Sequence, residues 1–272
     1  MKKIALFSLA FIACLFSLSC RKSDRNNDKE VFSVMDNIMA VNFINDLYNQ
    51  VMEGASLQTE LNKVQSTCTT YTVTAAAPDT VFPKTLTIDF GISNCVDANN
   101  VNHRGQIIAV FSNKYKVLNA TIVITFLNYF YKDMEINGTF TITNKGLNAA
   151  GNKVFYITTT DATIYTQDKK SYVYYNCMFK KECIAGTGTP EITDDTFMLT
   201  GTASGINQLG NTFTSVIETA LSVDNNCKHI VSGILKVTPK NLSVRKLNYG
   251  DGSCDGTMTF NINGATNNVV EE

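Results

Sequence analysis

The feature that most constrains the fold is a cysteine pair that occurs twice with the same spacing. Cys68 and Cys95 lie 27 positions apart, and so do Cys227 and Cys254. In each copy a strand-like run after the first cysteine stops at a Pro-Lys pair, and a second run ends at a glycine shortly before the closing cysteine. We therefore expect one disulfide-linked, two-stranded unit that is used near both ends of a β domain.

The first 19 residues have the pattern of a signal peptide. Two lysines precede an apolar run over residues 4–19, which is too short for a membrane-spanning helix. The run ends at Cys20 in a context that resembles a bacterial lipobox, with Ser17 in place of the usual leucine, whereas Cys14 fits less well. We expect cleavage after residue 19 and lipidation of Cys20. A secreted protein with a cysteine near an ordinary cleavage site is the alternative.

An acyl lipid on Cys20 would anchor the protein to a membrane without spanning it, because each buried methylene contributes about 0.8 kcal/mol. Residues 20–27 are polar and would form a tether. The chain has 23 Lys and Arg against 24 Asp and Glu, so no basic excess indicates a nucleic-acid partner. We predict a lipid-anchored monomer.

Six cysteines remain after Cys14 and Cys20, an even number that is typical of a disulfide framework in an exported chain. The repeated spacing selects the two pairs described above. Cys177 and Cys183 are left, and we expect them to pair across a short loop of residues 178–182. Zinc is disfavoured because no CxxC spacing occurs and the chain has two histidines.

A helical segment is expected over residues 28–66. Apolar side chains recur at spacings of three and four between residues 31 and 51, and Gly54 is a fitting stop. Such a helix needs a surface to cover, and we expect it to pack on the β domain. The alternative is a partner-binding or membrane-lying helix, although no Lys or Arg lies between Glu30 and Gly54 to favour an anionic membrane.

The periodicity changes to two over residues 67–272. Runs rich in β-branched and aromatic residues alternate with Asn, Gly and Asp clusters, which is typical of strands joined by hairpins. No helical stretch long enough for parallel crossovers intervenes. We predict an all-β domain, either an antiparallel curved sheet or a β-sandwich, with an N-terminal helix.

A short motif predicts where the sheet bends. An aliphatic residue, a small polar residue and a glycine recur four times, ending at Gly138, Gly201, Gly233 and Gly264. A glycine inside a strand marks a bulge, a bend or a close approach between backbones. We therefore expect curvature at these positions.

Three runs together resemble an uncharacterised family of lipoproteins from Bacteroidota: PKTLTIDFG (83–91), VSGIL (231–235) and YGDGSCD (249–255). The resemblance covers nearly all of the mature chain and weakens over residues 96–104 and 167–183. It implies an envelope lipoprotein at the outer membrane, on the periplasmic face or at the cell surface. It implies no activity.

One weak metal signal is present. Asp251, Ser253 and Asp255 place oxygen atoms at alternate positions before a glycine, as in the first half of a calcium loop. The glutamate that completes such a loop is replaced by Ile262. The sequence favours a disulfide-held turn over a calcium site, and it predicts no other metal and no cofactor.

The sequence contains no recognisable catalytic group. His103 and His229 lie in different halves, and no nucleophile or carboxylate pair is placed beside either of them. We predict a non-catalytic binding or structural component of the outer envelope, with a glycan or an envelope protein as partner. The alternatives are a carrier that holds lipid or another apolar ligand on a concave sheet beneath the helix, and a hydrolase.

The lipidation site is directly testable. A Cys20→Ser chain should fail to incorporate a labelled fatty acid in a bacterial host, because the acceptor thiol is missing, whereas Cys14→Ser should label like the unaltered chain. Labelling is measured by in-gel fluorescence of an alkyne fatty acid. Persistent labelling of Cys20→Ser would contradict the assignment.

Overall fold

The computed structural model describes residues 28–57, 68–74, 81–189 and 192–271. These residues form one long helix, α1 (Phe32–Leu57), and a single antiparallel sheet of fourteen strands. The strands are β1 (Thr70–Thr74), β2 (Lys84–Asp89), β3 (Cys95–Val96), β4 (Asn102–Phe111), β5 (Thr121–Tyr131), β6 (Met134–Leu147), β7 (Lys153–Tyr165), β8 (Tyr172–Ala185), β9 (Thr196–Ile206), β10 (Thr212–Asp224), β11 (Ile230–Pro239), β12 (Arg245–Asp251), β13 (Thr257–Ile262) and β14 (Ala265–Val270).

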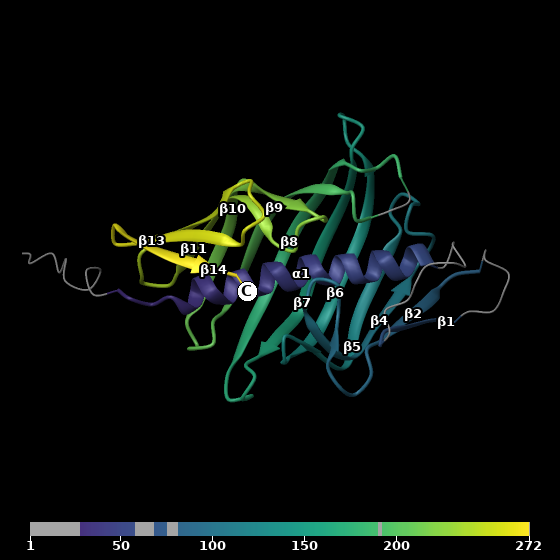
Figure 1. Cartoon of the computed structure of the whole chain (residues 1–272), viewed down its shortest axis with the longest axis horizontal. Helices are drawn as coiled ribbons and strands as arrows, with labels where there is room; N and C mark the ends of the chain where they lie inside the picture. The colour runs from purple at the N-terminus through teal and green to yellow at the C-terminus, as the bar shows by residue number, and fades with distance from the viewer. Residues whose placement is uncertain (1–27, 58–67, 75–80, 190–191, 272) are drawn as a thin grey trace, which may run out of the picture.

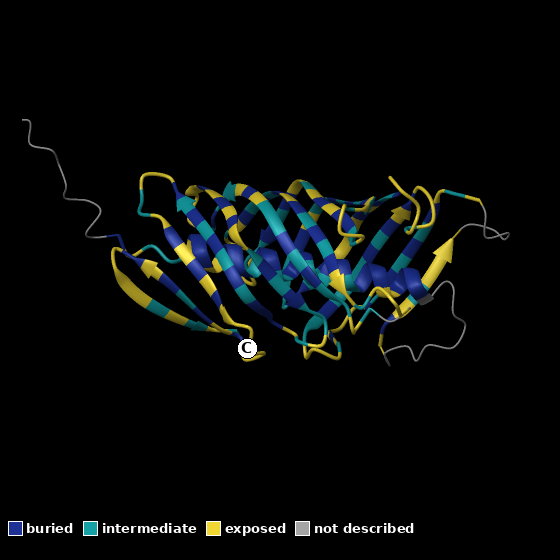
Figure 2. Ribbon diagram, turned by 90° about the horizontal axis from the view of Figure 1, so that it is seen from above, coloured by how far each residue is buried: buried dark blue, intermediate teal, exposed yellow. Residues whose placement is uncertain are grey.

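The sheet is a meander in which nearly every strand pairs with its neighbour in sequence. The order runs from β1 to β14, and only the short β3 lies off this path, paired with β4. The sheet is open and curved, and α1 lies across its strands (Figure 1). Seen from above, the sheet arches over the helix (Figure 2). The prediction of an all-β fold with an N-terminal helix is confirmed, and of its two architectures the chain adopts the curved sheet.

The helix begins where the Glu30 carboxylate accepts a hydrogen bond from the Ser33 amide at 2.7 Å. A side-chain acceptor at this place satisfies one of the free amides of the first turn. We expected the helix to stop at Gly54, but it continues to Leu57. Gly54 instead allows a close approach, because a Cβ there would lie 2.7 Å from Leu86 of β2.

The concave face of the sheet and α1 share one core. Phe43 of the helix packs against four rings of β5 and β6, with ring centroids 5.2 to 6.4 Å apart. The most deeply buried apolar residues of α1 are Val34, Ala40, Val41, Phe43, Ile44, Leu47 and Val51. Full burial of one large apolar side chain stabilises a fold by about 1.5 to 3 kcal/mol. The helix is thus part of the core.

Glycines shape the curvature at three of the four predicted positions. Gly201 and Gly233 have φ values of 133° and 112°, and a Cβ on either would lie within 2.5 Å of a backbone carbonyl oxygen of the adjacent strand. Gly138 has the same surroundings, and the strand register shifts beside Gly138 and Gly233. Gly264 differs, because it lies in the turn between β13 and β14.

Both repeated cysteine pairs form disulfides, Cys68 with Cys95 and Cys227 with Cys254. The predicted third pair is wrong, because Cys177 and Cys183 are free and buried within β8. Residues 178–182 are not a loop but strand, paired with β7 and β9. Six residues of strand separate two Cα atoms by about 20 Å, whereas a disulfide needs about 4.4 to 6.8 Å.

A buried ion pair holds the start of α1. Arg245 of β12 is fully buried, and its Nη2 donates to Asp28 Oδ1 at 2.6 Å and to the Glu30 carbonyl at 2.8 Å. Burial alone would raise the pKa of Asp28, but hydrogen bonds from Arg245 and from the amides of Ser243 and Glu30 outweigh it and lower the pKa. The helix start is therefore tied to the far end of the chain.

Replacement of Arg245 should lower the free energy of unfolding. Arg245→Met leaves the Asp28 carboxylate buried without its partner, and loss of one member of a buried pair costs about 3 to 5 kcal/mol. Lys246→Ala is the matched control, because its pair with Glu218 is exposed and should contribute no more than about 1 kcal/mol. Urea unfolding followed by circular dichroism measures both. Equal losses would contradict the role of Arg245.

Candidate metal centre

Two segments that flank the disulfides, one after Cys95 and one before Cys227, contact α1. The turn after β3 reaches the helix where Gln50 Nε2 donates to Asp97 Oδ2 at 3.4 Å. The turn before β11 reaches it where Asn49 Nδ2 donates to Asn225 Oδ1 at 3.3 Å. Segments next to both disulfides thus cover α1 from the two ends of the sheet.

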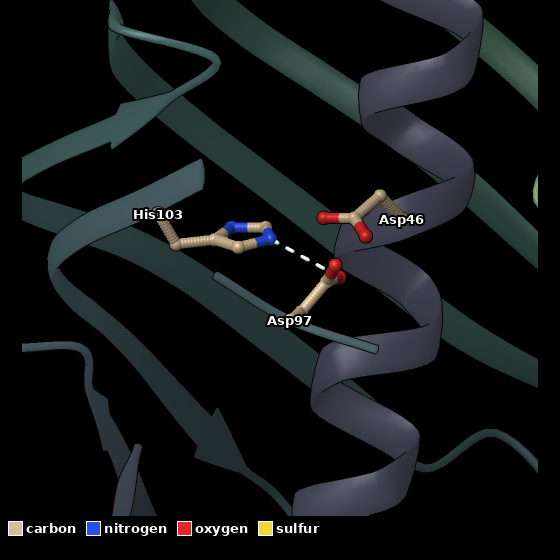
Figure 3. Close-up of side chains that lie close together, drawn as sticks. All are labelled: Asp46, Asp97 and His103. Carbon is tan, nitrogen blue, oxygen red and sulfur yellow. Dashed lines mark hydrogen bonds and ion pairs between the residues drawn. The ribbon is translucent and has the colours of Figure 1, made fainter. Parts of the chain in front are cut away.

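Under this cover, Asp46, Asp97 and His103 converge from three different elements. Asp46 lies on α1, Asp97 follows β3, and His103 lies in β4 (Figure 3). One ligand atom from each residue lies within 4.8 Å of the others, and no second group of this kind occurs within the described ranges. We name these three residues the carboxylate–histidine cluster.

Backbone contacts orient Asp97. Its Oδ1 accepts hydrogen bonds from the amides of Asn99 and Val101 at 2.9 and 2.8 Å, which closes a tight turn. Asn100 occupies the left-handed region in this turn with φ of 63°. Because Oδ1 is used by the backbone, Oδ2 faces His103, whose Nε2 lies 3.3 Å away.

His103 is held rigidly. The residue is fully buried, and its ring stacks on Phe90 with centroids 4.8 Å apart. Its Nδ1 lies 2.9 Å from the Tyr129 hydroxyl. Cys95 is one of the two cross-strand partners of His103, so the first disulfide supports the same position. Metal-binding histidines are commonly fixed in this way through the second ring nitrogen.

The pKa values of the two carboxylates are shifted in opposite directions. Burial and, more weakly, the charge of Asp97 raise the pKa of Asp46 to about 6, although His103 opposes this shift. Burial also acts to raise the pKa of Asp97, but hydrogen bonds from His103 and Val101 outweigh it and lower the pKa. Oδ2 of Asp46 is shielded from solvent and has no hydrogen-bond partner. The cluster therefore contains an acceptor atom without a donor.

A polar cavity of about 50 Å³ adjoins Asp46. Its walls carry several side-chain amides, and Oδ1 of Asn49 is also buried there without a donor. His229 and Glu271 also line it, and His229 Nδ1 lies 3.2 Å from Glu271 Oε2. This second histidine–carboxylate pair has no second carboxylate beside it in the described part of the chain, which makes it a natural control for the cluster.

The calcium candidate forms an ordinary turn. Asp251 Oδ1 accepts the Ser253 amide at 3.0 Å, and Asp255 Oδ1 accepts the Thr257 amide at 2.8 Å. All three candidate residues are exposed, and they are not among the described groups whose ligand atoms lie together. The lipidation candidate Cys20 lies outside the described residues.

Sequence reasoning missed the carboxylate–histidine cluster because its members come from a helix, a turn and a strand. Two signals were present in the sequence. Asp46 is an acidic residue on the polar side of the predicted helix, and Asp97 and His103 both follow Cys95 within eight positions. Only the curvature of the sheet, which sequence periodicity does not specify, brings residues 97–103 over α1.

Comparisons with protein-family models, with curated proteins and with solved structures find no match. Within the described ranges, no helix is long and apolar enough to cross a membrane. The chemistry of the chain therefore has to be inferred from its own residues. Two carboxylates and an imidazole form a mixed oxygen and nitrogen ligand set, which suits Zn²⁺ and other first-row divalent ions.

The opposite pKa shifts predict opposite mutational effects in the presence of a chelator. The folded pKa of Asp46, about 6, exceeds the ordinary value of 3.8, so its ionisation destabilises the fold above pH 6 and not below pH 4. Asp46→Asn should therefore stabilise the protein at pH 8 by about 1 to 3 kcal/mol and by almost nothing at pH 4.

Asp97→Asn is the matched variant and should destabilise the protein at pH 8, because the folded pKa of Asp97 is lowered and its charge is favourable. This loss should shrink as the pH falls through the range in which aspartate protonates. Urea unfolding at pH 4 and pH 8 measures both effects. Destabilisation by Asp46→Asn at pH 8 would contradict the assignment.

Proposed function

We propose that the protein is a non-catalytic, lipid-anchored binding module of the bacterial cell envelope, and that its ligand is a divalent transition-metal ion held by Asp46, Asp97 and His103. The observation that carries the proposal is the Asp46 carboxylate, which has one buried oxygen without a donor and lies beside a second carboxylate and a fixed imidazole. A buried negative group of this kind requires a compensating positive charge.

A proton and a metal ion compete to supply the positive charge that compensates Asp46. Below pH 6 a proton on Asp46 supplies the compensation, because the pKa of that carboxyl is raised to about 6. Above pH 6 the carboxylate is ionised and available as a ligand. Metal ligands must be deprotonated, so metal affinity should increase as the pH rises through this value.

The ligand set favours Zn²⁺, Mn²⁺ or Fe²⁺ over Ca²⁺ and Mg²⁺, which prefer six or more oxygen ligands. Water in the adjoining cavity would complete the coordination. That cavity measures about 50 Å³, which suits a few water molecules but not an organic substrate. Its size supports binding rather than hydrolysis as the function.

The packing of α1 disfavours a carrier in which the helix is a removable lid. Val41, Phe43 and Leu47 are almost completely buried against the sheet, so lifting the helix would expose much of the core. Location in the envelope is supported by the signal-like N-terminus, the resemblance to outer-membrane lipoproteins and the two disulfides, which are typical of oxidising compartments. A glycan or envelope-protein partner stays a prediction.

Isothermal titration calorimetry of the chelator-treated protein tests metal binding. We expect one Zn²⁺ per chain with a Kd of about 1 μM or tighter at pH 7.5, and little heat with Mg²⁺ or Ca²⁺. Asp46→Asn and His103→Gln should abolish binding, and His229→Gln should preserve it. Below pH 6 the affinity should fall about tenfold per pH unit as a proton occupies Asp46.

Two outcomes would overturn the metal proposal. One is the absence of heat with Zn²⁺ and Mn²⁺ for the unaltered protein. The other is full Zn²⁺ binding by Asp46→Asn, which we expect to fold at least as well as the unaltered chain, so that a negative result for this variant cannot arise from misfolding.

A further inference from the structure

A second cavity lies beside the C-terminal half of α1, away from the carboxylate–histidine cluster. It has a volume of about 210 Å³ and is bounded by α1, β6 to β9 and the turn between β4 and β5. Its floor is aromatic, since Tyr48 packs edge-on against Phe155 and Phe197 with centroids 5.7 and 5.5 Å apart. Met52 of α1 and Leu147 of β6 extend the apolar wall.

Cationic groups lie at the mouth of this cavity. Lys116 is exposed in the turn between β4 and β5, and Lys153 is half-buried at the start of β7. The Lys153 ammonium donates to the Thr187 carbonyl at 3.4 Å, which places it at the rim. An apolar floor with ammonium groups at its opening matches a molecule that has an apolar body and an anionic end.

A third ammonium group lies beneath the floor. Lys181 is fully buried, and its Nζ lies 4.4 Å from the ring centroids of both Tyr48 and Phe197. It donates a hydrogen bond to the side-chain oxygen of Asn45. Burial lowers the pKa of Lys181 to about 7. A buried amine would be stabilised in its charged form by an anion nearby.

One acidic group opposes these charges. Asp195 lines the cavity, and the thiol of Cys183 lies 3.5 Å from its Oδ1. Burial raises the pKa of Asp195, which reduces the share of its ionised form. Of the charged residues that line the cavity, Lys116 and Lys153 are cationic and Asp195 is acidic, so the lining has a net positive charge.

We propose that this cavity binds a small, free monocarboxylate with an apolar chain or ring, whose body packs on Tyr48, Phe155 and Phe197 and whose carboxylate lies at Lys116 and Lys153. The proposal is independent of the metal centre. It also differs from a carrier with a helical lid, because the cavity exists while α1 is fully packed.

Octanoate is the probe, and 1-octanol and octylamine are its neutral and cationic counterparts of equal chain length. Binding to the full mature chain is measured in the presence of EDTA by isothermal titration calorimetry and by thermal shift. We expect octanoate to bind at least about tenfold more tightly than 1-octanol and octylamine to bind least. EDTA keeps the result separate from that of the metal proposal.

Charge variants complete the test. Lys116→Gln combined with Lys153→Gln should weaken octanoate binding about tenfold and leave 1-octanol binding unchanged, whereas Lys228→Gln, at the other cavity, should change neither. Equal affinity for octanoate and 1-octanol would overturn the proposal, because it would show that the cavity binds the apolar chain without recognising the carboxylate. Absence of octanoate binding would overturn it as well.

Discussion

The burial of α1 in the hollow of the sheet is the constraint on which the rest of the structure depends. A long antiparallel meander has an apolar concave face, and a sheet cannot leave such a face in water. The helix supplies the second layer of the core and occupies the space that a second sheet would fill in a sandwich. The register bends at Gly138 and Gly233 let the strands wrap around this cylinder.

Much of this architecture follows from local sequence patterns. The change from a helical period to a period of two separates α1 from the strands, and the repeated 27-residue spacing identifies both disulfides. The third pairing failed because counting cysteines ignores geometry: Cys177 and Cys183 lie on one strand face, too far apart to join. The glycine motif succeeded within strands and failed at Gly264, because a short motif does not distinguish a bend from a turn.

The site residues were harder to predict, for a physical reason. Local periodicity determines which face a residue occupies, but the contact between Asp46 and residues 97–103 depends on how far the whole sheet curves. Each strand pair adds a small twist, so this closure is a property of many strands together. The position of Asp97 and His103 shortly after Cys95 was a trace of this contact in the sequence, but it did not identify Asp46 as their partner.

The ion pair between Asp28 and Arg245 joins residues 217 positions apart. Most other contacts of the sheet are between neighbouring strands and can form as the chain lengthens, whereas this one needs the last strands. Because a chain is synthesised from its N-terminus, α1 appears before the strands, and its start is secured only when β12 is present. A chain that ends before β12 lacks the partner of Asp28. The start of α1 is therefore held in place only when the last strands are present.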